Sequence, residues 1–84
     1  MSPTPTIHLK VITPHRILCE ADAAEVSLPS LDGLIGILPG HRPMVVALGE
    51  GTLTFWAEGE IEAHEVRGGY AEIRGDRVLV FTEI

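Results

Sequence analysis

The stretch GEGTLTFWAEG, residues 49–59, decides the fold class of this chain. Between two glycine-containing turn signals, the apolar residues Leu53 and Phe55 alternate with threonines. A period of two places every second side chain on the same face of a β-strand. The stretch therefore predicts a half-buried strand between two tight turns.

The same pattern extends in both directions, because 9 glycines and 6 prolines divide the 84 residues into short segments. This density of helix breakers excludes long helices almost everywhere. Alternating segments occur again at 7–11 and 78–81, and turn signals separate the segments by roughly the 8 to 12 residues typical of a sandwich or barrel. The sequence predicts an all-β fold of nine or ten short strands in an antiparallel β-sandwich.

One segment, residues 15–28, contains neither Gly nor Pro and has fair helix propensity in its middle. We favour two strands, at 16–20 and 25–28, with a turn near Asp22. Each of these strands keeps the alternation, whereas a helical apolar stripe would have to include Glu25.

Composition indicates a single globular domain over residues 1–84, with 1–6 as a flexible tail. The chain is 45% hydrophobic and 21% charged, which is too apolar for a disordered protein. Aromatic residues make up only 5%, so we expect a core of Ile, Val, Leu and Ala.

Charge and cysteine content exclude several classes of protein. The 6 basic and 12 acidic residues give a net charge of -6, which argues against nucleic acid or anionic lipid as a partner. The single cysteine, Cys19, cannot form an internal disulfide and indicates a reducing compartment. No signal peptide and no apolar run of ~20 residues is present, so we expect a soluble domain without direct membrane insertion.

Motifs that carry chemistry are missing from the sequence. The spaced glycines of residues 33–40 resemble a phosphate-binding loop, but His41 and Arg42 follow where such a loop needs Lys and Ser or Thr. No serine lies in a nucleophile elbow, and the histidines lack the spacing that places two imidazoles on one metal ion. The sequence thus predicts no catalytic residue, no cofactor site and no metal site, and it predicts surface or turn positions for His8, His15, His41 and His64.

Two predicted strands, 44–48 and 78–81, are apolar on both faces. One interpretation is that loops of the same chain shield the second face. The other is that a partner protein covers it. The pattern alone leaves both open.

Two motifs identify a family. Residues 36–43 read GILPGHRP, after the strand-like VSLP at 26–29, and residues 68–73 read GGYAEI. With the opening segment 7–14, these stretches resemble the amino-terminal domain of the epsilon subunit of the rotary F-type ATP synthase. The resemblance covers nearly all of the chain from Ile7 to Ile84.

The resemblance implies a flattened sandwich of about ten short strands in the central stalk of the enzyme, bound to the gamma subunit and resting on the c-ring. The chain would be a non-catalytic rotor subunit that couples proton or sodium translocation to ATP synthesis. It would lie at the cytoplasmic face of the bacterial inner membrane as a peripheral part of the complex. Under this interpretation a partner covers the two-faced strands.

The resemblance also assigns residues to the two partners. Asp32, Gly33 and Leu34 would face the c-ring, and Thr13, His41 and Arg42 would lie towards gamma. At Leu34 the family commonly carries a polar residue, which makes the ring contact of this chain different in detail.

A second departure is that the family usually continues into a carboxy-terminal helical hairpin, which this sequence does not contain. The sequence does not separate a naturally short subunit from a piece of a longer one. The alternative function is a free-standing β-sandwich that binds a small molecule or a metal through its histidines.

Overall fold

Nine β-strands and no helix make up residues 5–83, the part of the chain described by a computed structural model. Within that range, no helix exists that could cross a membrane. The strands are β1 (Ile7–Ile12), β2 (Ile17–Ala23), β3 (Glu25–Ser30), β4 (Gly33–Ile37), β5 (His41–Ala47), β6 (Glu50–Ala57), β7 (Glu60–Arg67), β8 (Tyr70–Gly75) and β9 (Arg77–Phe81). The predicted flexible tail, residues 1–6, lies mostly outside the described residues.

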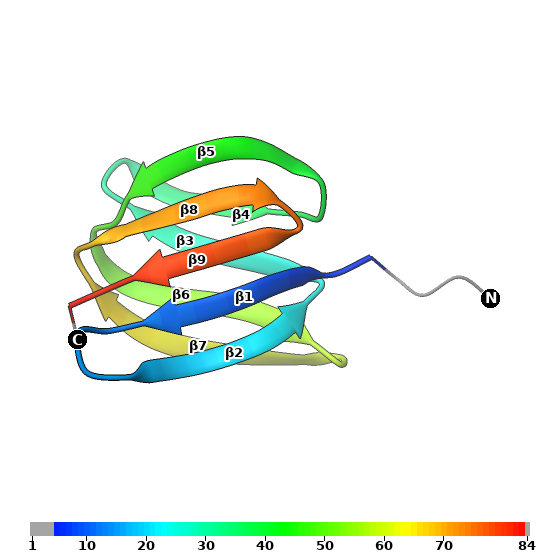
Figure 1. Cartoon of the computed structure of the whole chain (residues 1–84), viewed down its shortest axis with the longest axis horizontal. Coiled ribbons are helices and arrows are strands. Elements are labelled where there is room, and N and C mark those ends of the chain that lie inside the picture. The colour runs from blue at the N-terminus through cyan, green and yellow to red at the C-terminus, as the bar shows by residue number, and fades with distance from the viewer. Residues whose placement is uncertain (1–4, 84) are drawn as a thin grey trace.

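The strands form two sheets that pack face to face (Figure 1). The five-stranded sheet has the order β2-β1-β9-β8-β5, and the four-stranded sheet has the order β4-β3-β6-β7. The predicted all-β sandwich is confirmed. Most pairings are antiparallel as expected, but β1 and β9, the first and last strands, pair in parallel.

The core lies between the sheets and is built from the alternate residues of each strand. In the decisive segment β6, Leu53 and Phe55 are buried while Trp56 is 43% exposed on the other face. The fully buried set is dominated by aliphatic side chains, with Phe55 as the one aromatic among them. This composition agrees with the expectation drawn from the low aromatic content.

The ambiguous segment forms two strands, but the predicted turn near Asp22 is misplaced. Strand β2 continues through Asp22 to Ala23, because these residues pair with His8 and Ile7 of β1. The chain passes to the other sheet at Ala24, whose backbone N–H donates a hydrogen bond to the Trp56 carbonyl. Pairing with β1 therefore sets the end of β2 at Ala23, and local propensity alone does not predict this boundary.

Gly69 illustrates why glycine is required at one of the turns. Its φ of 92° lies in a region that L-residues rarely adopt, and a Cβ there would overlap the Phe81 carbonyl oxygen. Gly36, by contrast, lies within β4. There the atom nearest to a Cβ would be Glu25 Oε2 at 3.8 Å.

His64 departs from the expected surface or turn position. It lies on β7 directly opposite Leu53, and its ring stacks parallel to Phe55 with centroids 6.0 Å apart. Its Nε2 atom is buried without a hydrogen-bond partner among the described residues, and Glu62 Oε1 is 3.9 Å away. The His64 ring therefore packs, partly buried, against Phe55.

We expect Gly69→Ala to destabilise the domain by roughly 3 kcal/mol or more, because strain and overlap with the Phe81 carbonyl add together. The matched control Gly36→Ala has room for a methyl group and should change stability by less than ~1 kcal/mol. Urea unfolding of both variants measures the difference. Equal effects would contradict the proposed close approach.

Adjacent residues of β6 give a second prediction. Phe55→Ala removes a buried ring and should lower the free energy of unfolding by about 3–5 kcal/mol. Trp56→Ala, on the outer face, should cost about 1 kcal/mol or less. Thermal or urea unfolding tests this, and a larger loss at Trp56 than at Phe55 would show that the strand faces are inverted.

Candidate partner interface

The outer face of the five-stranded sheet changes from apolar to charged along the strand direction. The register aligns three rows of residues across it. The first row contains Ile12, Phe81, Tyr70 and Ala47 on β1, β9, β8 and β5. The second contains Lys10, Leu79, Glu72 and Val45, and the third contains His8, Arg77 and Arg74.

We call the first set the apolar row: Ile12, Phe81, Tyr70 and Ala47. The rings of Tyr70 and Phe81 stack with centroids 4.9 Å apart and an interplanar angle of 28°. Tyr70 is nevertheless 44% exposed, and Val45 beside the row is 68% exposed. A contiguous exposed apolar patch of this kind is typical of a protein interface.

A shallow groove of about 290 Å³ runs beside the apolar row. Ile12, Pro14, Tyr70 and Phe81 supply most of its apolar wall, and Glu83 stands at its rim. Stacked aromatic rings next to a groove with a charged rim suit an apolar side chain from a partner.

The exposures on β5 test the interpretation that loops of the same chain shield the two-faced strands. Val46, Val78 and Val80 are buried in the core, whereas Val45 of the same β5 strand stays exposed. No loop within residues 5–83 therefore shields the outer face at this strand. Shielding by the chain's own loops is therefore wrong at Val45, and the other interpretation, that a partner protein covers this face, stays a prediction.

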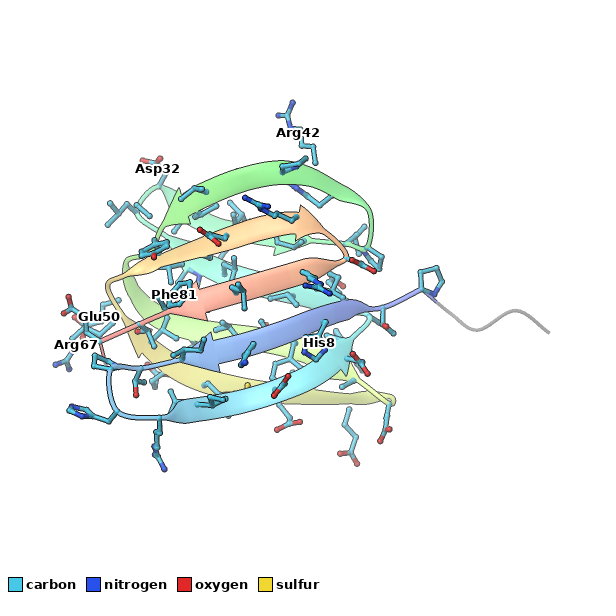
Figure 2. The ribbon with its side chains drawn as sticks, in the orientation of Figure 1. His8, Asp32, Arg42, Glu50, Arg67 and Phe81 are labelled. Carbon is cyan, nitrogen blue, oxygen red and sulfur yellow. The ribbon has the colours of Figure 1, made fainter. Side chains whose placement is uncertain are left out.

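The charged end of the face contains His8 between two carboxylates of β2 (Figure 2). Hydrogen bonds to Asp22 and then to Glu20 raise the pKa of His8 above its ordinary value of 6.5. The sequence did not predict that these three side chains would meet. The only available signal was that Glu20 and Asp22 are two residues apart, which would place both on one face if the strand predicted at 16–20 continued through the turn predicted near Asp22.

The predicted ring-side residues Asp32, Gly33 and Leu34 lie together at the hairpin between β3 and β4. The Ser30 hydroxyl donates to the Gly33 carbonyl and accepts the Asp32 backbone N–H, which closes the turn. Leu34 is 72% exposed, and the neighbouring Leu31 is 71% exposed. The tip therefore presents two leucines around one carboxylate.

His41 and Arg42, two of the predicted gamma-side residues, begin β5 at the opposite end from the apolar row. His41 pairs with Gly75, and its Nδ1 lies 2.8 Å from the Arg42 carbonyl oxygen. Arg42 is exposed, and its side chain points away from the body of the sandwich (Figure 2). The guanidinium is thus free to meet a carboxylate of another molecule.

Thr13, the third of these residues, is not brought together with the other two. Thr13 follows Ile12, the last residue of β1. This end of the sheet also contains Ala47, the last residue of β5, whereas Arg42 lies near the start of β5, at the other end. The Thr13 side chain is buried, and its hydroxyl accepts the backbone N–H groups of His15 and Arg16. Thr13 therefore shapes the turn beside the groove and has little surface to offer.

Within residues 5–83, no three His, Cys, Asp or Glu side chains converge in a geometry that could hold a metal ion. Burial, with a smaller contribution from Glu62, raises the pKa of the Cys19 thiol, so the thiol stays protonated at neutral pH. Cys19 packs against the core as a small, partly buried side chain.

Known proteins resemble the chain over this whole domain. The ATP synthase epsilon chain of Solibacter usitatus is 39% identical over 79 residues, which make up 94% of this chain and 59% of that relative. The epsilon chain of Synechococcus elongatus is 44% identical over 75 residues, 89% of this chain and 55% of the relative. This chain thus spans little more than half the length of these curated relatives.

Solved structures share the fold. A chain of the Euglena gracilis mitochondrial ATP synthase (OSCP/F1/c-ring) superposes with a TM-score of 0.85 at 24% identity, covering 98% of this chain and 52% of that chain. A chain of the central stalk/c-ring of the Tetrahymena thermophila mitochondrial ATP synthase superposes with a TM-score of 0.77 at 11% identity, covering 99% of this chain and 67% of that one.

The family described as ATP synthase, Delta/Epsilon chain, beta-sandwich domain matches residues 6–84. This match includes both motifs on which the resemblance was based, GILPGHRP and GGYAEI. The two-sheet sandwich built above is the architecture that the family description names. The chain therefore belongs to the beta-sandwich domain family of the ATP synthase delta and epsilon chains.

Proposed function

We propose that this chain is a non-catalytic adaptor in the rotor of a proton- or sodium-translocating F-type ATP synthase, where it joins the gamma subunit to the c-ring and couples rotation to ATP synthesis. The observation that carries the proposal is the exposed apolar row with Val45 beside it, on a face that no described loop covers. The names of the curated relatives, ATP synthase epsilon chains, support the ATP synthase as the assembly in which the chain works.

The mechanics of the fold suit a part that transmits torque. Interstrand hydrogen bonds run through both sheets, and turns fixed by glycines such as Gly69 connect the strands. A closely packed core resists deformation, so a force applied to one surface reaches the other with little internal movement. The adaptor needs no active site for this role.

We assign the apolar row and Val45 to the gamma subunit. Stacked rings of Tyr70 and Phe81 beside a groove supply the buried centre of such a contact. His41 and Arg42 belong to its outer rim, where a charge sets orientation more than affinity. Thr13 contributes indirectly, because its hydroxyl accepts a backbone hydrogen bond from Arg16 and so holds the turn that lines the groove.

We assign Asp32, Gly33 and Leu34 to the c-ring. Their hairpin projects from the same end of the sandwich as Phe81 (Figure 2), which gives the adaptor two adjoining surfaces for two partners. Exposed leucines around Asp32 suit a contact with an apolar centre and a polar edge. Bound in this way, the chain would lie peripherally at the cytoplasmic face of the bacterial inner membrane.

Charge placed at Val45 tests the gamma surface. Because Val45 is 68% exposed, Val45→Asp should leave the isolated domain folded, yet it would bury a carboxylate in the contact. We expect at least about tenfold weaker binding to purified gamma by calorimetry. The control Ala63→Asp, exposed on the outer face of the other sheet, should bind as the wild type does. Equal affinities for all three proteins would contradict the assignment.

Crosslinking tests both surfaces in the assembled complex. In a Cys19→Ala background, a single cysteine at Leu34 should crosslink to a c-ring subunit, and one at His41 should crosslink to gamma. A cysteine at Glu60, exposed on β7, serves as the control that should crosslink to neither. Assembly without a crosslink from Leu34 or His41 would refute the surface assignment while leaving the adaptor role in place.

A further inference from the structure

We propose that His8, Asp22 and Glu20 form a proton-operated clasp: uptake of one proton by the His8 ring ties the edge strand β2 to β1, and loss of that proton releases the tie. The clasp goes beyond the proposed adaptor function and does not depend on it.

Geometry places both ring nitrogens of His8 against carboxylates. The Nδ1 atom lies 3.1 Å from Asp22 Oδ1, and the Nε2 atom lies 2.7 Å from Glu20 Oε2. A neutral imidazole carries a single N–H and can donate to only one acceptor. Ionised carboxylates only accept hydrogen bonds, so both contacts are satisfied together when the ring is the doubly protonated imidazolium.

The backbone holds the three groups in register. His8 lies directly opposite Asp22, and Glu20 lies opposite the next outward residue of β1, Lys10. The His8 backbone N–H donates to the Asp76 carbonyl at 2.6 Å, which fixes the strand that carries the ring. No large rearrangement is therefore needed to make or break the clasp.

Other charges around the ring set the strength of the clasp. Lys10 on β1 and Arg77, opposite His8 on β9, are cationic, so they disfavour an additional positive charge on the His8 ring. Asp76, in the turn before β9, lines a second surface depression together with His8, Lys10 and Arg77, and its carboxylate favours the positive charge on the ring. Asp22 and Glu20 contact the ring directly, and their hydrogen bonds outweigh the small effect of desolvation, so the pKa of His8 lies above 6.5.

The clasp lies where it can stabilise the edge strand β2. Strand β2 is at the edge of its sheet, with β1 as its neighbour there, and it continues at Ala24 into β3 of the other sheet. Asp22 is two residues before this crossing. A side-chain tie at this point resists fraying of the edge strand where the chain passes between the sheets.

The sign of the pH dependence follows from the raised pKa. The clasp is complete below the ordinary histidine value of 6.5, and its contribution disappears as the pH rises through the higher pKa of the folded state. Since His8 and both carboxylates are substantially exposed, the contribution is modest and decreases with added salt.

Nuclear magnetic resonance of the histidine ring protons tests the clasp directly. We expect the His8 signal, assigned by its loss in His8→Gln, to titrate above 6.5. The Glu20→Gln and Asp22→Asn changes should each lower that pKa, and the double variant should bring it to about 6.5 or below. A His8 pKa that does not move in the double variant would overturn the proposal.

Thermal unfolding supplies the second measurement. At about pH 5.5 the wild type should unfold about 2–5 °C above His8→Gln, and the difference should vanish near pH 9. The control His15→Gln removes an exposed turn histidine and should show no such pH-dependent difference. If His8→Gln lowered the unfolding temperature equally at both pH values, the loss would come from packing of the ring, and the proton-operated clasp would be refuted.

Discussion

The parallel pairing of β1 with β9 is the constraint on which the rest of the structure depends. It joins the two ends of the described chain and makes one sheet out of two pieces, β2-β1 and β9-β8-β5. Contacts between segments so far apart in sequence have a high entropic cost before they form. Once formed, they align Ile12 with Phe81, which joins the apolar row across the sheet, and they place Arg77 opposite His8. The contacts of His8 with Asp22 and Glu20 come from the pairing of β1 with β2.

The outer face of the five-stranded sheet has apolar residues at one end of its strands and charged residues at the other. The apolar row gains free energy by removing rings and aliphatic groups from water, which favours a permanent partner. The charged end, around His8, stays hydrated and responds to pH and salt. Because the two lie at opposite ends of the same strands, a partner can cover the apolar end while the charged end remains in contact with solvent.

The two ends are also held by different means. Near the apolar row, the Thr82 backbone N–H donates to the Ile12 carbonyl at 2.9 Å, and the Thr82 hydroxyl accepts the Arg67 N–H at 2.9 Å. These neutral hydrogen bonds link β9, β1 and β7 and do not change with pH near neutrality. At the other end, ionisable side chains make part of the link between β1 and β2. The contacts that hold the apolar end therefore include neutral hydrogen bonds, whereas those at the charged end include groups that titrate.

The amino-acid sequence was enough to predict the all-β class, most strand positions and the family. The reason is that period-two alternation, glycine turns and the GILPGHRP motif are local properties of neighbouring residues. Only the tertiary structure decided the β1–β9 pairing, the end of β2 at Ala23, the burial of Thr13 and the meeting of His8 with Asp22. Each of these depends on register between distant strands, and a shift of one residue would move every side chain of a strand to its other face. Register is set by the packing of the whole core, so it depends on contacts between segments that are far apart in the sequence.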